Sequence, residues 1–265
     1  MSPLTISLLQ QDLFWEDKTA NLNSFEKALQ QIPSGTHLVV LPEMFNTGFS
    51  MNADALAEKM DGPSVDWMKN IALKKRIILT GSLMIREEGK YYNRLIWMLP
   101  NGQFAYYDKR HCFGYAGEDK IFTPGKKRLI ASVNGWKICL MVCYDLRFPV
   151  WSRNRFSEDE LTPEYDLLVY VANWPEKRIH AWNTLLQARA IENQCFVAGV
   201  NRTGIDGNGI YYNGSSMLIN PAGEILYHKC DTPDIFTTTL LPEQITEWRF
   251  RYPFLKDQDH FLIEA

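Results

Sequence analysis

The chain has 265 residues, of which 46% are hydrophobic and 22% charged, so it holds enough apolar material for one large domain with a sizeable core. The formal net charge is −3 and no basic stripe occurs, which argues against nucleic acid as a partner. No apolar run approaches the roughly 20 residues of a membrane span, and the N-terminus lacks the basic start of a signal peptide, so we predict a cytoplasmic protein without membrane contact.

Cysteine and histidine usage gives no sign of a disulfide framework or of a metal site. The cysteine count is odd and no C-x-x-C pair occurs. The five histidines show no metal-ligand spacing. We therefore predict no metal and no organic cofactor. The cysteines are Cys112, Cys139, Cys143, Cys195 and Cys230.

The first part of the chain alternates predicted strands and helices. Apolar residues fall on one face of residues 17–32, which favours an amphipathic helix. Successive turn signals after residue 85 predict a meander of hairpins. Residues 44–60 show no clear period and are predicted to be a loop. The expected strands are 4–9, 37–41, 76–85, 91–99 and 104–107, and the expected helices are 17–32 and 61–75.

The second part contains more strands and a single clear helix. Residues 111–127 have little periodicity and contain several glycines, which indicates a long loop of the kind that often carries function. Residues 203–209 read as a glycine-rich turn, and the aromatic, charged tail 248–261 as an arm lying on a surface. The expected strands are 128–133, 136–142, 166–172, 195–200, 211–219, 224–228 and 235–240, and the expected helix is 178–193.

These elements predict an α/β fold in which two mixed sheets are flanked by helices, a four-layer α-β-β-α sandwich. We assign residues 1–243 to this domain and residues 244–265 to a C-terminal arm of the same single domain. Because such an arm can lie on its own or on a partner subunit, we expect a homodimer or a higher homo-oligomer.

Cys143 follows an apolar run that reads as a strand buried on both faces. Pro149 cannot continue a strand ladder, so Cys143 stands where a core strand gives way to a turn. A lone cysteine in an apolar strand usually only packs, and Cys139 fits that description. Cys143 is a candidate nucleophile only if a base and an oxyanion stabiliser converge on it.

Three segments place potentially catalytic residues at the ends of apolar strands: Leu-Pro-Glu43, Tyr-Asp-Lys109-Arg-His and Val-Cys143-Tyr-Asp-Leu-Arg-Phe-Pro. This order resembles the carbon–nitrogen hydrolase (nitrilase) superfamily, whose catalytic set is Glu, Lys and Cys. Residues 143–154 and the tail resemble the bacterial omega-amidase-like branch. Further matching segments are 118–125, 172–175, 189–193 and 220–224.

The resemblance implies a catalytic role for each matching residue. Cys143 would attack an amide carbonyl and form a thioester, and Glu43 would move the protons. Lys109 and the backbone N–H of Tyr144 would stabilise the oxyanion. Glu118 resembles the second glutamate of the family, which positions the substrate and supports the lysine. The candidate substrate-binding residues are Asn173, Trp174 and Arg147, with Tyr144 at the oxyanion.

The substrate class implied is a small dicarboxylic acid monoamide such as 2-oxoglutaramate, cleaved to the acid and ammonia. The alternatives are another amidase, nitrilase or carbamoyl hydrolase of the superfamily, and a non-catalytic binding or scaffold protein on the same fold. Two pairs are read as structural, Asp145 with Arg147 and Arg189 with Glu192. The candidates to hold a distal carboxylate are Arg110, Lys120, Lys126 and Arg147, and the sequence does not choose among them.

Overall fold

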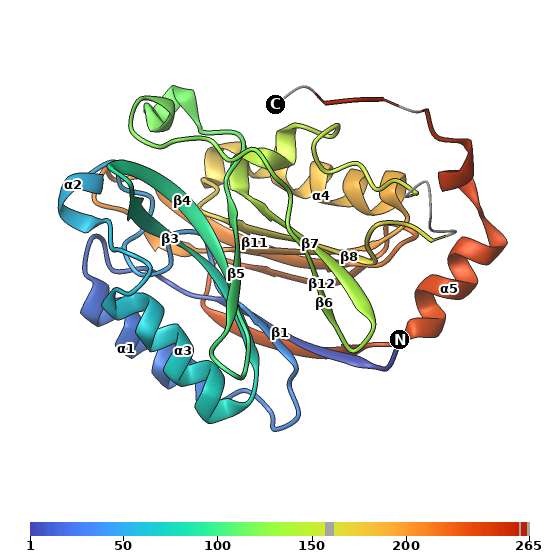
Figure 1. Cartoon of the computed structure of the whole chain (residues 1–265), viewed down its shortest axis with the longest axis horizontal. Helices are drawn as coiled ribbons and strands as arrows, with labels where there is room; N and C mark the ends of the chain where they lie inside the picture. Colours follow the sequence, from blue (N-terminus) through green and yellow to red (C-terminus); the bar gives the residue numbers. More distant parts are fainter. Residues whose placement is uncertain (157–161, 260, 264–265) are drawn as a thin grey trace.

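Two β-sheets lie face to face at the centre of the molecule, and helices cover both outer faces (Figure 1). The computed structural model describes residues 1–156, 162–259 and 261–263. The predicted four-layer α-β-β-α sandwich is confirmed. None of the helices within the described residues is long and apolar enough to cross a membrane.

The first sheet is mixed and six-stranded, in the order β13-β1-β2-β3-β4-β5. Its strands are β1 (Leu4–Gln10), β2 (Leu38–Val40), β3 (Ile78–Glu87), β4 (Lys90–Met98), β5 (Phe104–Asp108) and β13 (Asp234–Leu240). β1, β2 and β3 are parallel, whereas β3, β4 and β5 form the predicted antiparallel meander.

The second sheet has three parallel strands, β7, β8 and β9, with antiparallel strands on both sides of them. Its strands are β6 (Ile130–Val133), β7 (Trp136–Val142), β8 (Leu167–Ala172), β9 (Phe196–Asn201), β10 (Thr203–Ile205), β11 (Tyr211–Ile219) and β12 (Ile225–Cys230). β10 lies inside the segment predicted to be only a turn. With three residues it is too short to give a period of its own, and its pairing with β11 makes it a strand.

The helices pack on the outer sheet faces because alternate residues of a strand point to opposite sides. Leu38 and Val40 enter the core between the sheets, whereas Val39 packs with Phe25 and Met68 of the helices outside. The helices are α1 (Lys18–Leu29), α2 (Ala53–Leu56), α3 (Pro63–Lys75), α4 (Ile179–Asn193) and α5 (Pro242–Arg251). α2 is a single turn within the segment 44–60 that was predicted to be a loop.

The C-terminal tail, predicted to be an arm lying on a surface, begins as a helix. α5 starts with proline at its first position and ends beyond residue 248, where the arm was predicted to begin. Ile245 is buried in the core, and Arg249 bonds Asp166 at 2.6 Å, so this part packs on its own chain. Residues 260 and 264–265 of the predicted arm lie outside the described residues. The division of the chain at residues 243 and 244 stays a prediction.

Candidate active site

Cys143 is the first residue after β7 and begins the short 3-10 turn η3 (Cys143–Arg147). Its φ of +44° lies in the left-handed region, which residues other than glycine rarely adopt. Strain of this kind persists only where surrounding contacts hold it, and it clusters at functional sites. The side chain is 8% exposed and lines a pocket, so the sharp turn presents the thiol at the end of the strand.

The side chain of Asp145 holds this turn in place through hydrogen bonds. Its fully buried carboxylate accepts hydrogen bonds from the backbone N–H of Val142 at 3.0 Å and from the Tyr107 hydroxyl at 2.7 Å. The backbone N–H of His111 donates to it at 3.0 Å and the His111 Nδ1 lies 2.8 Å away. Asp145 thus ties the segment around residue 109 to the cysteine turn. The predicted pairing of Asp145 with Arg147 is wrong.

Lys109, Glu43 and Glu118 form a buried ionic cluster. The Lys109 Nζ lies 2.9 Å from Glu43 Oε1, and 3.0 and 2.8 Å from the two carboxylate oxygens of Glu118. Lys109 is 1% exposed and both glutamates are fully buried. The chain returns tightly past Lys109, because a Cβ on Gly125 would lie 2.0 Å from the Asp108 carbonyl oxygen. The structure therefore brings together the three charged residues that the sequence singled out.

Burial and mutual charge set the protonation of the cluster. Burial lowers the pKa of Lys109, but the Glu118 and Glu43 carboxylates outweigh it and raise that pKa well above its ordinary value. Burial raises the pKa of Glu118, Lys109 opposes this, and Glu43 adds to it. Burial, followed by the Glu43 carboxylate, raises the pKa of the Cys143 thiol well above its ordinary value. Cys143 therefore rests as a thiol beside a carboxylate rather than as a thiolate.

We expect the alkylation of Cys143 by iodoacetamide to accelerate continuously up to about pH 9, because the thiolate fraction keeps growing while the pH stays below the raised pKa. Peptide mapping by mass spectrometry separates Cys143 from the half-buried Cys112 and Cys230. Cys143→Ala supplies the background rate. A plateau of the Cys143 rate near neutral pH would contradict a resting thiol.

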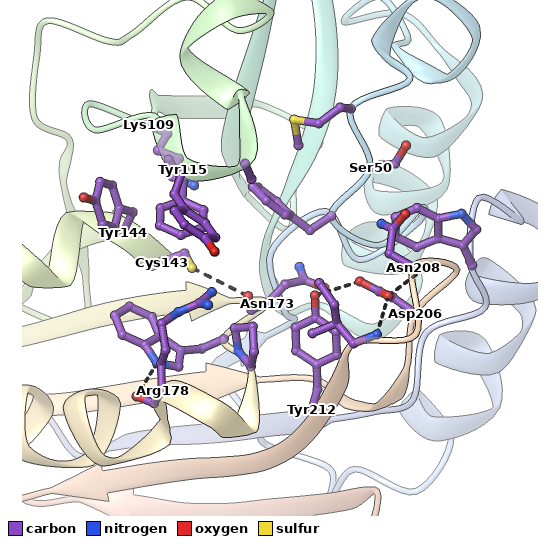
Figure 2. Close-up of a pocket in the computed structure, with 18 of the residues that line it drawn as sticks. Ser50, Lys109, Tyr115, Cys143, Tyr144, Asn173, Arg178, Asp206, Asn208 and Tyr212 are labelled. Atoms are coloured by element: carbon purple, nitrogen blue, oxygen red, sulfur yellow. Dashed lines mark hydrogen bonds between the residues drawn. The ribbon is translucent and has the colours of Figure 1, made fainter.

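Asn173 follows β8 at the same edge as Cys143 and contacts both Glu43 and the thiol. Its backbone N–H donates to Glu43 Oε2 at 2.8 Å, and its Nδ2 donates to the Glu43 carbonyl at 2.5 Å. The Cys143 Sγ lies 3.9 Å from the Asn173 carbonyl oxygen (Figure 2). Trp174 donates through its Nε1 to the Arg178 carbonyl at 2.9 Å. Both residues line the pocket, as does the aromatic ring of Tyr144.

The pocket has a volume of about 590 Å³ and opens over Cys143. Figure 2 shows Lys109, Tyr115 and Tyr144 around Cys143, whereas Asp206 and Asn208 lie toward the opposite end of the pocket. Six well-separated segments of the chain contribute to the lining, so only the complete fold creates it. The volume is ample for a small dicarboxylic acid amide.

Of the four basic residues proposed from sequence, Arg147 lines the pocket, and its guanidinium lies 4.9 Å from the centre of a Trp174 ring. Lys120 and Lys126 are exposed and, like Arg110, are not among the lining residues. Arg178 does line the pocket, with its guanidinium 5.1 Å from the centre of the Phe113 ring. The predicted pair of Arg189 and Glu192 is confirmed at 3.0 Å, and it lies outside the pocket.

Sequence reasoning missed Arg178 and Asn93. Arg178 stands at the predicted start of a helix, where a charged residue is expected to face solvent. Asn93 lies in β4 and is 1% exposed, with its amide between Glu43 and Glu118. The available signal was a neutral polar residue followed by Arg94 within residues 91–99, which are otherwise apolar or aromatic.

The model of the carbon–nitrogen hydrolase family matches residues 5–250. The chain belongs to the carbon–nitrogen hydrolase family. This hydrolase is 43% identical to an omega-amidase YafV of Escherichia coli strain K12 over 99% of its own length and 100% of the relative's. It is also 33% identical to a 2-oxoglutaramate amidase of Bacillus subtilis, over 84% of its own chain and 85% of the relative.

Solved structures support the assignment of this chain to the carbon–nitrogen hydrolase family. The protein XC1258 of Xanthomonas campestris, a CN-hydrolase superfamily protein with an arsenic adduct in its active site, superposes with a TM-score of 0.96 at 42% identity, and each chain is covered completely. Nit3 of Saccharomyces cerevisiae, a nitrilase-superfamily member of branch 10, superposes with a TM-score of 0.82 at 25% identity over 95% of both chains. The predicted nitrilase-like fold is thereby confirmed.

Proposed function

We propose that this chain is an omega-amidase that hydrolyses the terminal amide of small dicarboxylic acid monoamides of the 2-oxoglutaramate type. The observation that carries the proposal is the strained Cys143 turn beside the buried Glu43, Lys109 and Glu118 cluster, at the base of the pocket. A relative that covers 99% of the chain is named omega-amidase, and a relative that covers 84% of it is named 2-oxoglutaramate amidase, which supports the substrate class.

In the acylation step, Cys143 Sγ attacks the amide carbonyl carbon and Glu43 takes the thiol proton as the C–S bond forms. The carbonyl π electrons move to oxygen, producing a tetrahedral intermediate. When this intermediate collapses, the C–N bond breaks and Glu43 returns the proton to the leaving nitrogen. Ammonia departs and a thioester remains on Cys143.

The oxyanion of the intermediate is stabilised by the Lys109 ammonium and by the backbone N–H of Tyr144, the residue after the nucleophile. Lys109 stays charged at neutral pH because burial, which lowers its pKa, is outweighed by its two carboxylate neighbours. Glu118 holds the ammonium through both of its oxygens, so the charge is fixed before the substrate arrives. A positive charge that is already fixed in place costs no reorganisation during the reaction.

In the deacylation step, water replaces ammonia beside Glu43. Glu43 takes one proton from the water as its oxygen attacks the thioester carbonyl, and a second oxyanion forms at the same position. Collapse breaks the C–S bond, and Glu43 returns the proton to the Cys143 sulfur. The acid is released and the resting thiol is restored.

Selection for an acidic substrate is assigned to Arg147 and Arg178, the arginines of the pocket lining. A carboxylate bound by arginine is a charge-assisted contact worth roughly 1.5–3 kcal/mol. At 1.4 kcal/mol per tenfold, this equals a preference of about ten- to hundred-fold for an acidic amide over its neutral analogue. Asn173 and Trp174 complete the walls against which such a substrate lies.

We expect kcat/KM for glutaramate to exceed that for glutaramide by about ten- to hundred-fold, and simple nitriles to be poor substrates. Arg178→Met and Arg147→Met should each reduce this preference while leaving the neutral amide within about threefold of its original rate, because the apolar stem is largely kept and the charged, hydrogen-bonding guanidinium is lost. Ammonia release measures all rates. Lys126→Met is the matched control, because Lys126 is exposed and is not among the residues that line the pocket.

Equal kcat/KM for the two amides, or faster nitrile hydrolysis, would remove the omega-amidase proposal and leave a general amidase, nitrilase or carbamoyl hydrolase. No turnover of any amide, nitrile or carbamoyl compound, together with an unreactive Cys143, would favour a binding or scaffold protein. The homo-oligomeric state and the cytoplasmic location stay predictions, and light scattering coupled to size-exclusion chromatography measures the first.

A further inference from the structure

The side-chain amide of Asn93 lies between the Glu43 and Glu118 carboxylates of the buried ionic cluster. Its Nδ2 donates to Glu43 Oε1 at 2.8 Å and to Glu118 Oε1 at 3.1 Å. The side chain is 1% exposed and is not part of the pocket lining, so it does not touch the substrate. The backbone carbonyl of the same residue accepts the backbone N–H of Lys109 at 2.9 Å. Asn93 therefore bonds both carboxylates through its side chain and is joined to Lys109 through the backbone.

The orientation of this amide follows from its neighbours. Both contacts are carboxylate oxygens, which only accept hydrogen bonds when ionised. Turning the amide over would set its carbonyl oxygen against two acceptors. In the observed orientation the Oδ1 has no hydrogen-bond partner among the described residues, so the donating half of the amide fixes the side chain.

Counting donors shows which carboxylate oxygen remains able to accept a proton. Glu43 Oε1 receives two donors, Lys109 Nζ and Asn93 Nδ2, whereas Glu43 Oε2 receives one, the backbone N–H of Asn173. Each oxygen of Glu118 receives two donors, since Lys109 contacts both, Asn93 contacts Oε1 and the backbone N–H of Phe113 contacts Oε2. With two lone pairs per oxygen, Glu43 Oε2 is the one of these four oxygens that keeps a free acceptor position among the contacts of the described residues.

We propose that Asn93 is a positioning residue that saturates Glu43 Oε1 and Glu118 Oε1 and so makes Glu43 Oε2 the atom that takes the Cys143 proton. This deepens the proposed function and rests on its assignment of Glu43 as the base. A neutral donor is required at this place. Aspartate of the same shape would add a third carboxylate around a single ammonium, and leucine of similar size would leave Glu43 Oε1 with only one donor.

The test compares Asn93→Leu and Asn93→Asp with the original enzyme, using the pH dependence of kcat/KM. Asn93→Leu should lower kcat about 10- to 100-fold, by analogy with the range measured when residues that orient metal ligands are removed, with KM changed by less than about threefold. In Asn93→Asp the cluster should bind an additional proton, because the charges facing position 93 are Glu43, Glu118 and Lys109. Its acidic limb should therefore move upward by about one pH unit or more.

Asn154→Leu is the matched control, since Asn154 is also fully buried and hydrogen-bonded but lies beside Tyr165 and Asn193. It should lower the melting temperature and leave the pH profile unchanged. If Asn93 served only the fold, its variants would behave in the same way. Wild-type pH profiles in both Asn93 variants, or kcat within about threefold of the original enzyme in Asn93→Leu, would overturn the proposal.

Alkylation of Cys143 by iodoacetamide separates this proposal from the substrate assignment, because its rate does not depend on which amide is hydrolysed. The extra carboxylate of Asn93→Asp should slow alkylation at about pH 8 by at least threefold relative to the original enzyme. Equal alkylation rates would refute the Asn93 proposal even if 2-oxoglutaramate is hydrolysed. Slower alkylation in an enzyme that does not hydrolyse 2-oxoglutaramate would support it and overturn only the substrate class.

Discussion

Cys143→Ala should lose at least about 10⁴-fold in turnover while the protein remains folded, since removal of a nucleophile eliminates the covalent route altogether. Cys143→Ser should lose nearly as much, because Glu43 and the pocket are arranged around a sulfur. The fold should survive both changes, because the strained φ of +44° is already carried by a residue with a Cβ and alanine adds no further strain. Ammonia release measures the loss, and thermal melting followed by circular dichroism measures the folded state.

An acyl adduct on Cys143 provides the complementary measurement. Acid quenching of the original enzyme during turnover should trap the thioester, with a mass increase assigned to the peptide that contains Cys143. Cys139→Ala is the matched control, because Cys139 lies in β7, the strand that leads to Cys143, but is fully buried in the core and is absent from the pocket lining. Turnover near the original rate in Cys143→Ala, or an adduct on another cysteine, would end the assignment.

The strand-end residues could be located from sequence because parallel strands align their carboxyl ends at one edge. β7 and β8 are parallel with Val142 opposite Val171, so Cys143 and Asn173 necessarily leave the sheet near each other. An apolar run that ends at a polar or reactive residue marks such a position. Glu43 and Lys109 follow runs of this kind as well, although their spacing in the sequence could not show which strand ends of the two predicted sheets meet.

The contacts that hold these residues could not be read from sequence because they join distant segments. Asp145 bonds Tyr107 and His111 from another strand end, whereas the nearby Arg147 points to Trp174. Local spacing suggested the wrong partner. Glu118 came only from the family resemblance, since a glutamate in an irregular loop is ordinarily exposed.

The burial of Asn93 could not be predicted from the pattern of its own strand. In a meander strand, a polar residue is normally assigned to the solvent face, because one face of an antiparallel sheet is often wet. Here β4 is covered on both faces, and Asn93 is buried because Glu43 and Glu118, from other parts of the chain, pack against it. The alternation of apolar and polar residues along one strand cannot predict contacts with such distant residues.

Glu43→Gln and Lys109→Met should each cost at least several hundred-fold in turnover, the scale of a lost acid–base or oxyanion group. In Glu43→Gln the side-chain oxygen should occupy the Oε1 position, where Lys109 and Asn93 donate. The amide nitrogen then faces the backbone N–H of Asn173 and cannot accept the thiol proton. The shape is kept and the base is lost, and ammonia release over a range of pH measures the effect.

Lys109→Met should have a second consequence, because it leaves Glu43 and Glu118 buried without a cation. Like charges favour protonation, so the carboxyl pair should bind a proton in the folded state that it does not bind when unfolded. Since the folded state then carries more protons than the unfolded state, the free energy of unfolding should fall as the pH rises. Breaking a buried ion pair costs about 3–5 kcal/mol, so the loss should be visible in thermal melts.

A pH series of melting temperatures distinguishes these two variants. Lys109→Met should be closest to the original protein at acidic pH and diverge from it as the pH increases, whereas Glu43→Gln, which removes one of the two carboxylates and keeps the ammonium, should show no such divergence. Lys126→Met, at an exposed position, supplies the control for a lost surface charge. If Lys109→Met melts with the pH dependence of the original protein, the cluster does not hold its charges as the geometry indicates, and Lys109 loses its role at the oxyanion.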